Sequence, residues 1–146
     1  MTAERHERGV LDTSTVISLS RISDPGALPL EPLITTVTLA ELSVGPLVAR
    51  DAQERAARQA HLQQAENDFT PLPFDAPAAR AFGRVAASLR QAGRKRAARA
   101  YDAMIAATAV ANALPVYTAN PGDFADIEGL EVVAIEPSYI TADPPP

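Results

Sequence analysis

The chain has 146 residues, of which 47% are hydrophobic and 21% are charged, so its composition is that of one ordinary globular domain able to bury a core. The absence of cysteine excludes disulfide bonds and thiolate metal sites, and the charged start and lack of a long apolar run argue against secretion and a membrane span, so we expect a cytoplasmic protein. The net charge of −5 argues against sequence-independent binding along nucleic acid, because such binding requires many positive charges to neutralise phosphates.

Short apolar runs alternate with helical patterns from one end of the chain to the other. The predicted strands cover residues 8–12, 30–36, 69–75, 115–118 and 131–137. The predicted helices cover residues 13–22, 37–50, 51–68, 76–93 and 102–112. Strands that alternate with helices indicate an α/β fold with a mainly parallel sheet, in which each crossover lays its helix against the sheet.

Glycine and proline refine several of these boundaries. Gly45 and Pro46 are expected to kink or interrupt the second predicted helix, and Gly93 is expected to end the fourth. The two prolines of "FTPLPFD" make residues 69–75 an edge strand or a short buried strand. The remaining prolines punctuate element boundaries, so we find no low-complexity segment.

Four carboxylates fall beside the carboxyl ends of predicted strands or the amino ends of predicted helices. Asp12 ends the first strand, and Glu41 lies in the first turns of the helix that follows the second strand. Asp102 begins the helix that leads back to the strand "PVYT", and Asp123 follows that strand within a five-residue turn. In a parallel sheet these ends share one edge, which is where α/β sheets place ligands. We therefore expect the four side chains to converge there.

Such a cluster needs a cation, because two like charges about 4 Å apart repel by about 4 kcal/mol at an effective dielectric near 20. The chain has only two histidines, His6 in the terminal segment and His61 on a predicted surface helix, so a zinc site has little support. Carboxylate oxygens suit Mg²⁺ or Mn²⁺. The pattern therefore predicts one of these ions as the cofactor.

Each acid also has a purely structural interpretation. Asp12, before "TST", could cap a helix, and Asp102 could be the partner of a helix dipole. Glu41 could be a solvated helix residue, and Asp123, after "NPG", a turn residue. Capping gives no reason for acids to recur at one sheet edge in four separate elements, so the joint pattern favours a shared site.

Four segments in order resemble the signature segments of PIN-domain ribonucleases, specifically the VapC-type toxins of bacterial toxin–antitoxin pairs. They are "VLDTSTVI", "TTVTLAELSVG", "AYDAMIAATA" and "LPVYTANPGDF", and the resemblance runs from Gly9 to Ile135. It implies a single PIN-like domain of three-layer α/β/α architecture, with a mainly parallel sheet of four to five strands. We place this domain at residues 9–137, with disordered termini at 1–8 and 141–146.

The resemblance also implies roles for individual residues. Asp12, Glu41, Asp102 and Asp123 would form the catalytic, metal-binding quartet of the family. Ser14, Thr118 and Asn120 match supporting positions near that quartet, although Asn120 stands where some relatives carry an acid. Which of Asn120 and Asp123 lies nearer the metal stays open. Ala119 replaces an arginine that is common in the family.

The implied activity is hydrolysis of RNA phosphodiester bonds with bound Mg²⁺ or Mn²⁺, by a toxin that a cognate antitoxin protein inhibits. The substrate would be single-stranded or looped RNA, of the kind found in tRNA or rRNA. The basic run "RQAGRKRAAR" lies just before Asp102, and it would either contact RNA through Arg94, Lys95, Arg96 and Arg99 or form a solvated surface. The family also suggests a homodimer and an antitoxin peptide along the apolar helix residues 39–48.

Three other functions compete with this one. A phospho-accepting receiver domain needs paired acids after its first strand and a lysine at a late strand end, whereas this chain has Asp12 alone and Lys95 in the basic run. A haloacid-dehalogenase phosphatase needs two aspartates separated by one residue, and Ser14 breaks that pattern. The remaining alternative is a non-catalytic PIN-like module whose acidic cleft docks a basic partner peptide.

Overall fold

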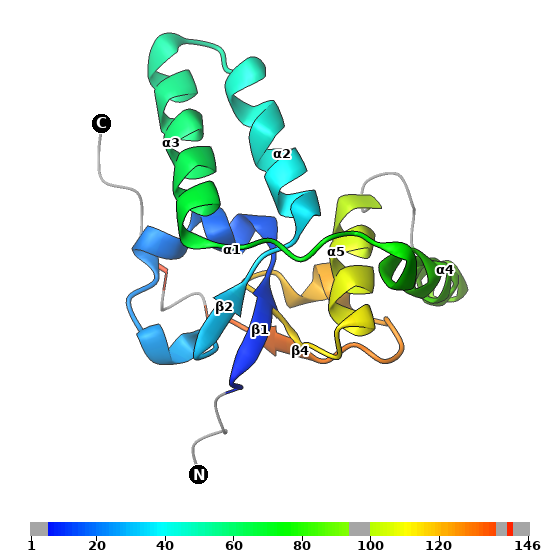
Figure 1. Ribbon diagram of the computed structural model, residues 1–146. Coiled ribbons are helices and arrows are strands. Elements are labelled where there is room, and N and C mark those ends of the chain that lie inside the picture. The colour runs from blue at the N-terminus through cyan, green and yellow to red at the C-terminus, as the bar shows by residue number, and fades with distance from the viewer. Residues whose placement is uncertain (1–5, 94–99, 137–139, 142–146) are drawn as a thin grey trace.

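The structure is a computed structural model that describes residues 6–93, 100–136 and 140–141. Its centre is a sheet in which every strand is parallel to its neighbours, in the order β2-β1-β3-β4 (Figure 1). The strands are β1 (Arg8–Leu11), β2 (Glu31–Leu33), β3 (Val116–Thr118) and β4 (Val132–Ala134). The predicted α/β class, with a mainly parallel sheet of four to five strands, is confirmed.

Within the described residues, α-helices and short 3₁₀ segments connect the strands. They are α1 (Thr13–Ile17), η1 (Leu19–Arg21), η2 (Pro25–Ala27), α2 (Thr36–Leu47), α3 (Ala52–Asp68), α4 (Ala76–Gln91), α5 (Ala100–Ala111) and η4 (Pro121–Phe124). Each of α1 to α4 begins after a side chain that accepts a hydrogen bond from a first-turn N–H, namely Asp12, Thr35, Asp51 and Asp75. No helix in the described ranges is long and apolar enough to cross a membrane.

Successive side chains of a strand point to opposite faces of the sheet, and β1 and β3 therefore supply two separate cores. Val10 and Val116 enter a cluster with residues of α4 and α5. Leu11 and Tyr117 enter a second cluster with residues of α1, α2 and α3. Helices thus cover both faces of the sheet, which is the expected three-layer α/β/α arrangement (Figure 1).

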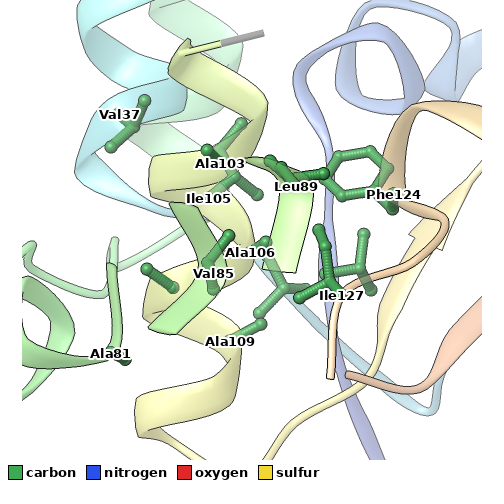
Figure 2. Packing of buried hydrophobic residues seen from close by; sticks show 13 residues of the cluster. Val37, Ala81, Val85, Leu89, Ala103, Ile105, Ala106, Ala109, Phe124 and Ile127 are labelled. Carbon is green, nitrogen blue, oxygen red and sulfur yellow. The ribbon is translucent and has the colours of Figure 1, made fainter. Parts of the chain in front are cut away.

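Small side chains let α4 and α5 pack against each other. The buried residues of α5 are mostly alanines, and they face Ala81, Val85 and Leu89 of α4 in the first cluster (Figure 2). Phe124 of η4 joins the same cluster and is 1% exposed. The α4–α5 pair and η4 are therefore held together beside β3.

The prediction of a third strand over residues 69–75 is wrong. Residues 69–75 form one isolated bridge, in which Leu72 exchanges backbone hydrogen bonds with Ile34 and Thr36, each 2.9 Å long. The next N–H that could continue this ladder is that of Phe74, and it donates to the Thr36 hydroxyl at 3.2 Å instead of a strand carbonyl. Pro71 and Pro73 have no N–H to offer a strand on the other side of Leu72, so the segment adds no strand to the sheet.

The structure tests three predictions about where helices begin, break or end. The predicted helix over 13–22 is split into α1 and η1. α2 runs through Gly45 and Pro46 and ends one residue later, at Leu47, so the interruption falls at the helix end. Gly93 follows α4 with a φ of +76°, a conformation that favours glycine, and the predicted end of that helix is confirmed.

The ends of the described chain are tied to the fold. The carbonyls of His6 and Glu7 accept hydrogen bonds from the backbone of Leu30 and Glu31, so the expected disorder at 1–8 does not hold for these residues. Thr141 donates to the carbonyl of Arg21. Residues 1–5 and 142–146, which complete the two predicted disordered termini, lie outside the described ranges, as does Pro137 of the predicted last strand.

Gly9 marks a close contact between β1 and β3. A Cβ built at this position would lie 2.6 Å from Cε1 of Tyr117 and 3.3 Å from Cβ of Pro29. The Tyr117 side chain is itself buried at 3% exposure, so it has little room to move away. A glycine is therefore required where the ring crosses the strand.

Candidate active site

Asp12 is the first residue after β1, and only 3% of it is exposed. Its backbone N–H still donates to the carbonyl of Tyr117, at 3.3 Å, which keeps it aligned with β3. Its side chain caps α1 by accepting from the N–H of Thr15, at 3.1 Å. The structural interpretation of Asp12 as a helix cap is therefore confirmed, and the cap itself places the carboxylate at the carboxyl edge of the sheet.

Four hydrogen-bond donors surround the Asp12 carboxylate. Oδ1 accepts from the N–H and the hydroxyl of Thr15. Oδ2 accepts from the hydroxyl of Thr118 at 2.7 Å and from that of Ser14 at 3.2 Å. Burying a carboxylate is costly unless it is hydrogen-bonded or paired with a cation, and here neutral donors provide the bonds. The negative charge thus remains available to a cation.

Glu41 lies next to this group on α2. Its Oε1 accepts a hydrogen bond from the Thr13 hydroxyl at 2.7 Å, and that hydroxyl lies 3.0 Å from the hydroxyl of Thr38. Burial raises the pKa of the Glu41 carboxyl, the hydrogen bond from Thr13 lowers it in part, and the negative charge of Asp12 raises it again. Thr13, which bonds Glu41, begins the helix that Asp12 caps, so the two acids lie side by side, and we call them the Asp12–Glu41 site.

The turn after β3 joins the same network. The side-chain amide of Asn120 donates to the Ser14 hydroxyl at 3.4 Å, and Ser14 in turn donates to Asp12. The backbone N–H of Asn120 donates to the Thr118 hydroxyl at 2.9 Å. The structure therefore brings the three predicted supporting residues, Ser14, Thr118 and Asn120, together around Asp12.

Asp102 and Asp123 sit on two elements that pack together beyond β3. Asp102 lies in the first described turn of α5, and Asp123 lies in η4. Their neighbours Ala103 and Phe124 belong to one buried cluster, which Figure 2 shows from close by. Because α5 runs back toward the start of β3, its first turn lies at the carboxyl edge of the sheet. Both acids are partly buried. Their participation in the site remains a prediction.

The donor chemistry of the Asp12–Glu41 site fits a hard divalent cation. In the described ranges, no group of three or more Asp, Glu or His side chains is arranged to hold a metal ion. Mg²⁺ does not need such a group, because it usually keeps several waters and is bound through one or two carboxylates together with substrate phosphates. Asp12 and Glu41 are the pair that could serve this purpose.

Sequence reasoning missed three threonines. Thr13 bonds Glu41, Thr15 bonds Asp12, and Thr38 contacts Thr13. The run "TST" directly after Asp12 was a usable signal, because hydroxyl side chains at a helix start often bond a capping carboxylate. Thr38 had no such signal. The predicted RNA contacts Arg94, Lys95, Arg96 and Arg99 lie outside the described residues.

Comparison with known proteins identifies the family of the chain. Residues 9–130 match the PIN domain family. Among characterised relatives, the chain is 42% identical over 129 residues to Ribonuclease VapC5 of Mycobacterium tuberculosis, a match that covers 87% of this chain and 93% of that protein. It is also 28% identical over 133 residues to Ribonuclease VapC1 of Rickettsia felis, covering 86% and 95% of the two chains.

Solved structures share the fold. The crystal structure of VapBC-5 from Mycobacterium tuberculosis, a member of the VapBC family of toxin–antitoxin systems, superposes with a TM-score of 0.77 and 38% identity, covering 88% of this chain and 99% of that one. VapBC2 from Rickettsia felis, bound to a DNA fragment of its promoter, gives a TM-score of 0.72 at 22% identity, covering 88% and 99%, which supports the fold alone. This chain therefore belongs to the PIN-domain family and, within it, to the VapC ribonucleases.

Proposed function

We propose that the protein is the toxin of a toxin–antitoxin pair and hydrolyses RNA phosphodiester bonds with Mg²⁺ or Mn²⁺. The observation that carries this proposal is the buried Asp12 carboxylate, held by four donors beside Glu41 at the carboxyl edge of a VapC-like sheet. Asp102 and Asp123 complete the proposed metal-binding quartet from α5 and η4. Action in the cytoplasm is part of the same proposal.

The chain's own residues prepare this site. Thr15 and Thr118 fix the orientation of the Asp12 carboxylate, and Thr13 fixes that of Glu41. A divalent ion bound there supplies a water of lowered pKa as nucleophile and offsets the negative charge that develops on the phosphate. Asn120 and Ser14 lie where they can orient a phosphate or its water, since their polar groups face Asp12.

An antitoxin protein and a second copy of the chain are the proposed partners, together with single-stranded or looped RNA as substrate. The solved relatives are toxin–antitoxin complexes. On α2, Val44 is 50% and Leu47 is 86% exposed, and Val48 just beyond the helix is 62% exposed. Exposed apolar groups this close together suit an antitoxin segment with an apolar face.

The direct test is cleavage of bulk RNA by the purified protein in Mg²⁺ or Mn²⁺, with a chelator as reference. Asp12→Asn and Asp102→Asn should each reduce cleavage by more than about 100-fold, because changes in groups that only support metal ligands already cost up to that factor. Asp68→Asn is the matched control, since Asp68 is an exposed carboxylate at the end of α3. Cleavage that survives both site changes would assign the activity to another site or to a contaminant.

The same experiment separates the nuclease from a non-catalytic docking module. A module that only binds a basic peptide would show no metal-dependent cleavage in the wild-type protein. Mapping RNA ends after brief expression in cells that lack the antitoxin would then identify the target.

A further inference from the structure

Basic residues are concentrated in one part of this acidic protein. Residues 76–101 contain seven of the thirteen arginines and lysines and none of the eighteen acids. This segment therefore carries +7, and the other 120 residues carry −12, which gives the net charge of −5. The net charge of the chain therefore hides a strongly basic segment.

Three of these basic residues lie on the described part of α4. Arg80, Arg84 and Arg90 are exposed, and none of them forms an ion pair with another described residue. Arg80 and Arg84 are one helical turn apart, and Arg90 lies about 15 Å from Arg80 along the helix axis. We call these three side chains the arginine face.

The surface between the arginines is low and open. A Cβ built at Gly83 would meet no atom within 4 Å, and a hollow of about 320 Å³ is lined by Gly83, Ala86, Ala87, Arg90 and Gln91. Small side chains therefore leave room for a chain to lie against the helix between the charged groups. The opposite side of α4, with Ala81, Val85 and Leu89, is buried against α5 (Figure 2).

The arginine face extends outward from the proposed active site. Leu89 packs in one cluster with Ala103 and Phe124, the neighbours of Asp102 and Asp123. Leu89 lies beside Phe124 in Figure 2, whereas Ala81 lies farther along α4, so the end of α4 that carries Arg90 is the end nearer η4. Arg84 and Arg80 follow back along the helix. The backbone N–H of Glu128 donates to the Ser88 hydroxyl of α4 at 3.5 Å.

We propose that the arginine face binds the phosphate backbone of substrate RNA outside the cleavage site. This inference rests on the proposed ribonuclease function, because it names a surface that binds the substrate of that function. An acidic site repels RNA, so a nuclease of net charge −5 needs cations elsewhere to hold the chain. A second copy of this protein is a poor occupant, since a two-fold interface over this face would bring both sets of three arginines together.

The test measures binding of a short, labelled single-stranded RNA to metal-free protein in chelator, so that cleavage does not interfere. Each phosphate contact contributes about 0.7 to the slope of log affinity against log salt for a single strand. The triple variant R80A/R84A/R90A should therefore lower the magnitude of that slope by about 2. The variant R80K/R84K/R90K keeps the charges and should keep the slope.

The control is R8A/R50A/R55A, which removes the same charge from three exposed arginines: Arg8 of β1, Arg50 just before α3 and Arg55 of α3. Arg8 and Arg50 pair with Glu31 and Glu54, so stability is measured alongside binding. The proposal is overturned if R80A/R84A/R90A keeps the wild-type slope, or if the control loses as much. It is also overturned if polyglutamate binds as tightly as RNA, or if sedimentation shows that the triple variant changes the association state.

The outcomes distinguish this inference from the proposed function. Asp12→Asn should bind RNA with the wild-type slope while losing cleavage. If the wild-type protein cleaves RNA but its RNA affinity does not depend on the arginine face, the ribonuclease function stands and the proposed RNA-binding surface is refuted. If the protein never cleaves RNA but its affinity shows the predicted dependence on salt, the RNA-binding surface stands and the ribonuclease function is refuted.

Discussion

The Asp12–Glu41 site and the arginine face are both charged, but they are built in opposite ways. Asp12 is 3% exposed, and each of its two carboxylate oxygens accepts two hydrogen bonds. The arginines of α4 are exposed, and none has an ionic partner among the described residues. One region is a fixed part of the interior, whereas the other is an open surface.

The difference follows from the cost of desolvation. A carboxylate removed from water must find partners within the protein, so the fold has to supply Thr15, Thr118 and Ser14 in fixed positions. A guanidinium that stays in water needs nothing from the fold beyond a helix to carry it. Changes near Asp12 should therefore affect stability as well as activity, while changes on the arginine face should affect binding alone.

The largest effect is expected from the core beneath the acids. Phe124→Ala should lower the free energy of unfolding by about 3–5 kcal/mol, because it empties the space of a buried ring beside α5. Urea denaturation followed by circular dichroism measures it. Tyr101→Ala, at a ring that is 54% exposed on α5, is the control and should cost much less. Equal losses would contradict the assignment of Phe124 to the core.

A smaller loss is expected when one donor to Asp12 is removed. Thr118→Val should cost about 1–3 kcal/mol, because Oδ2 of Asp12 keeps only the longer bond from Ser14 and the N–H of Asn120 loses its acceptor. Thr108→Val is the control, since the Thr108 hydroxyl only donates to the Met104 carbonyl within α5. Thr118→Ser should retain most of the stability. If Thr118→Val and Thr108→Val unfold at the same denaturant concentration, the hydrogen bonds to Asp12 contribute nothing.

A gain in stability is expected at Glu41. Its pKa is raised in the folded protein, so ionisation at neutral pH opposes folding, and this penalty disappears as pH falls below the usual carboxyl pKa. In chelator at neutral pH, Glu41→Gln should therefore melt slightly higher than the wild type. The difference should vanish at acidic pH. A melting temperature that falls at neutral pH would show that the hydrogen bond from Thr13 outweighs burial and the charge of Asp12.

The smallest effect on stability is expected from the arginine face. Each substitution in R80A/R84A/R90A should change the free energy of unfolding by no more than about 0.5 kcal/mol, since exposed side chains without partners are removed. Thermal melts of the variants and the wild type check this. A clear loss of stability would mean that these arginines make contacts within the fold, and it would remove the contrast between the two regions.

The sequence predicted the sheet well because its strands have strong local signals. β1, β3 and β4 are apolar runs bounded by turns or charges, and their order with the helices is that of a parallel sheet. The failure at residues 69–75 has a local cause too. "FTPLPFD" has the apolar content of a strand, but Leu72 forms a single bridge because the N–H of Phe74 bonds the Thr36 hydroxyl. The two prolines leave no N–H for a strand on the other side.

The candidate site was only partly predictable. Asp12 and Glu41 were identified from their places at strand and helix ends, and Thr118, Ser14 and Asn120 were identified from the resemblance to the family. The bonds among them depend on the alignment of β1 with β3, which brings residues more than 100 positions apart within hydrogen-bond distance. No local pattern encodes such distances, so the roles of Thr13 and Thr38 emerged only from the structure.

The contact at Gly9 links the far end of the sheet to the chemistry at its carboxyl edge. Gly9 and Tyr117 lie in the two strands that carry Asp12 and Thr118 at their ends. Any larger residue at position 9 would displace the Tyr117 ring, and Tyr117 supplies the carbonyl that accepts from the N–H of Asp12 and directly precedes Thr118. A glycine with no polar side chain of its own therefore protects the 2.7 Å bond between Thr118 and Asp12.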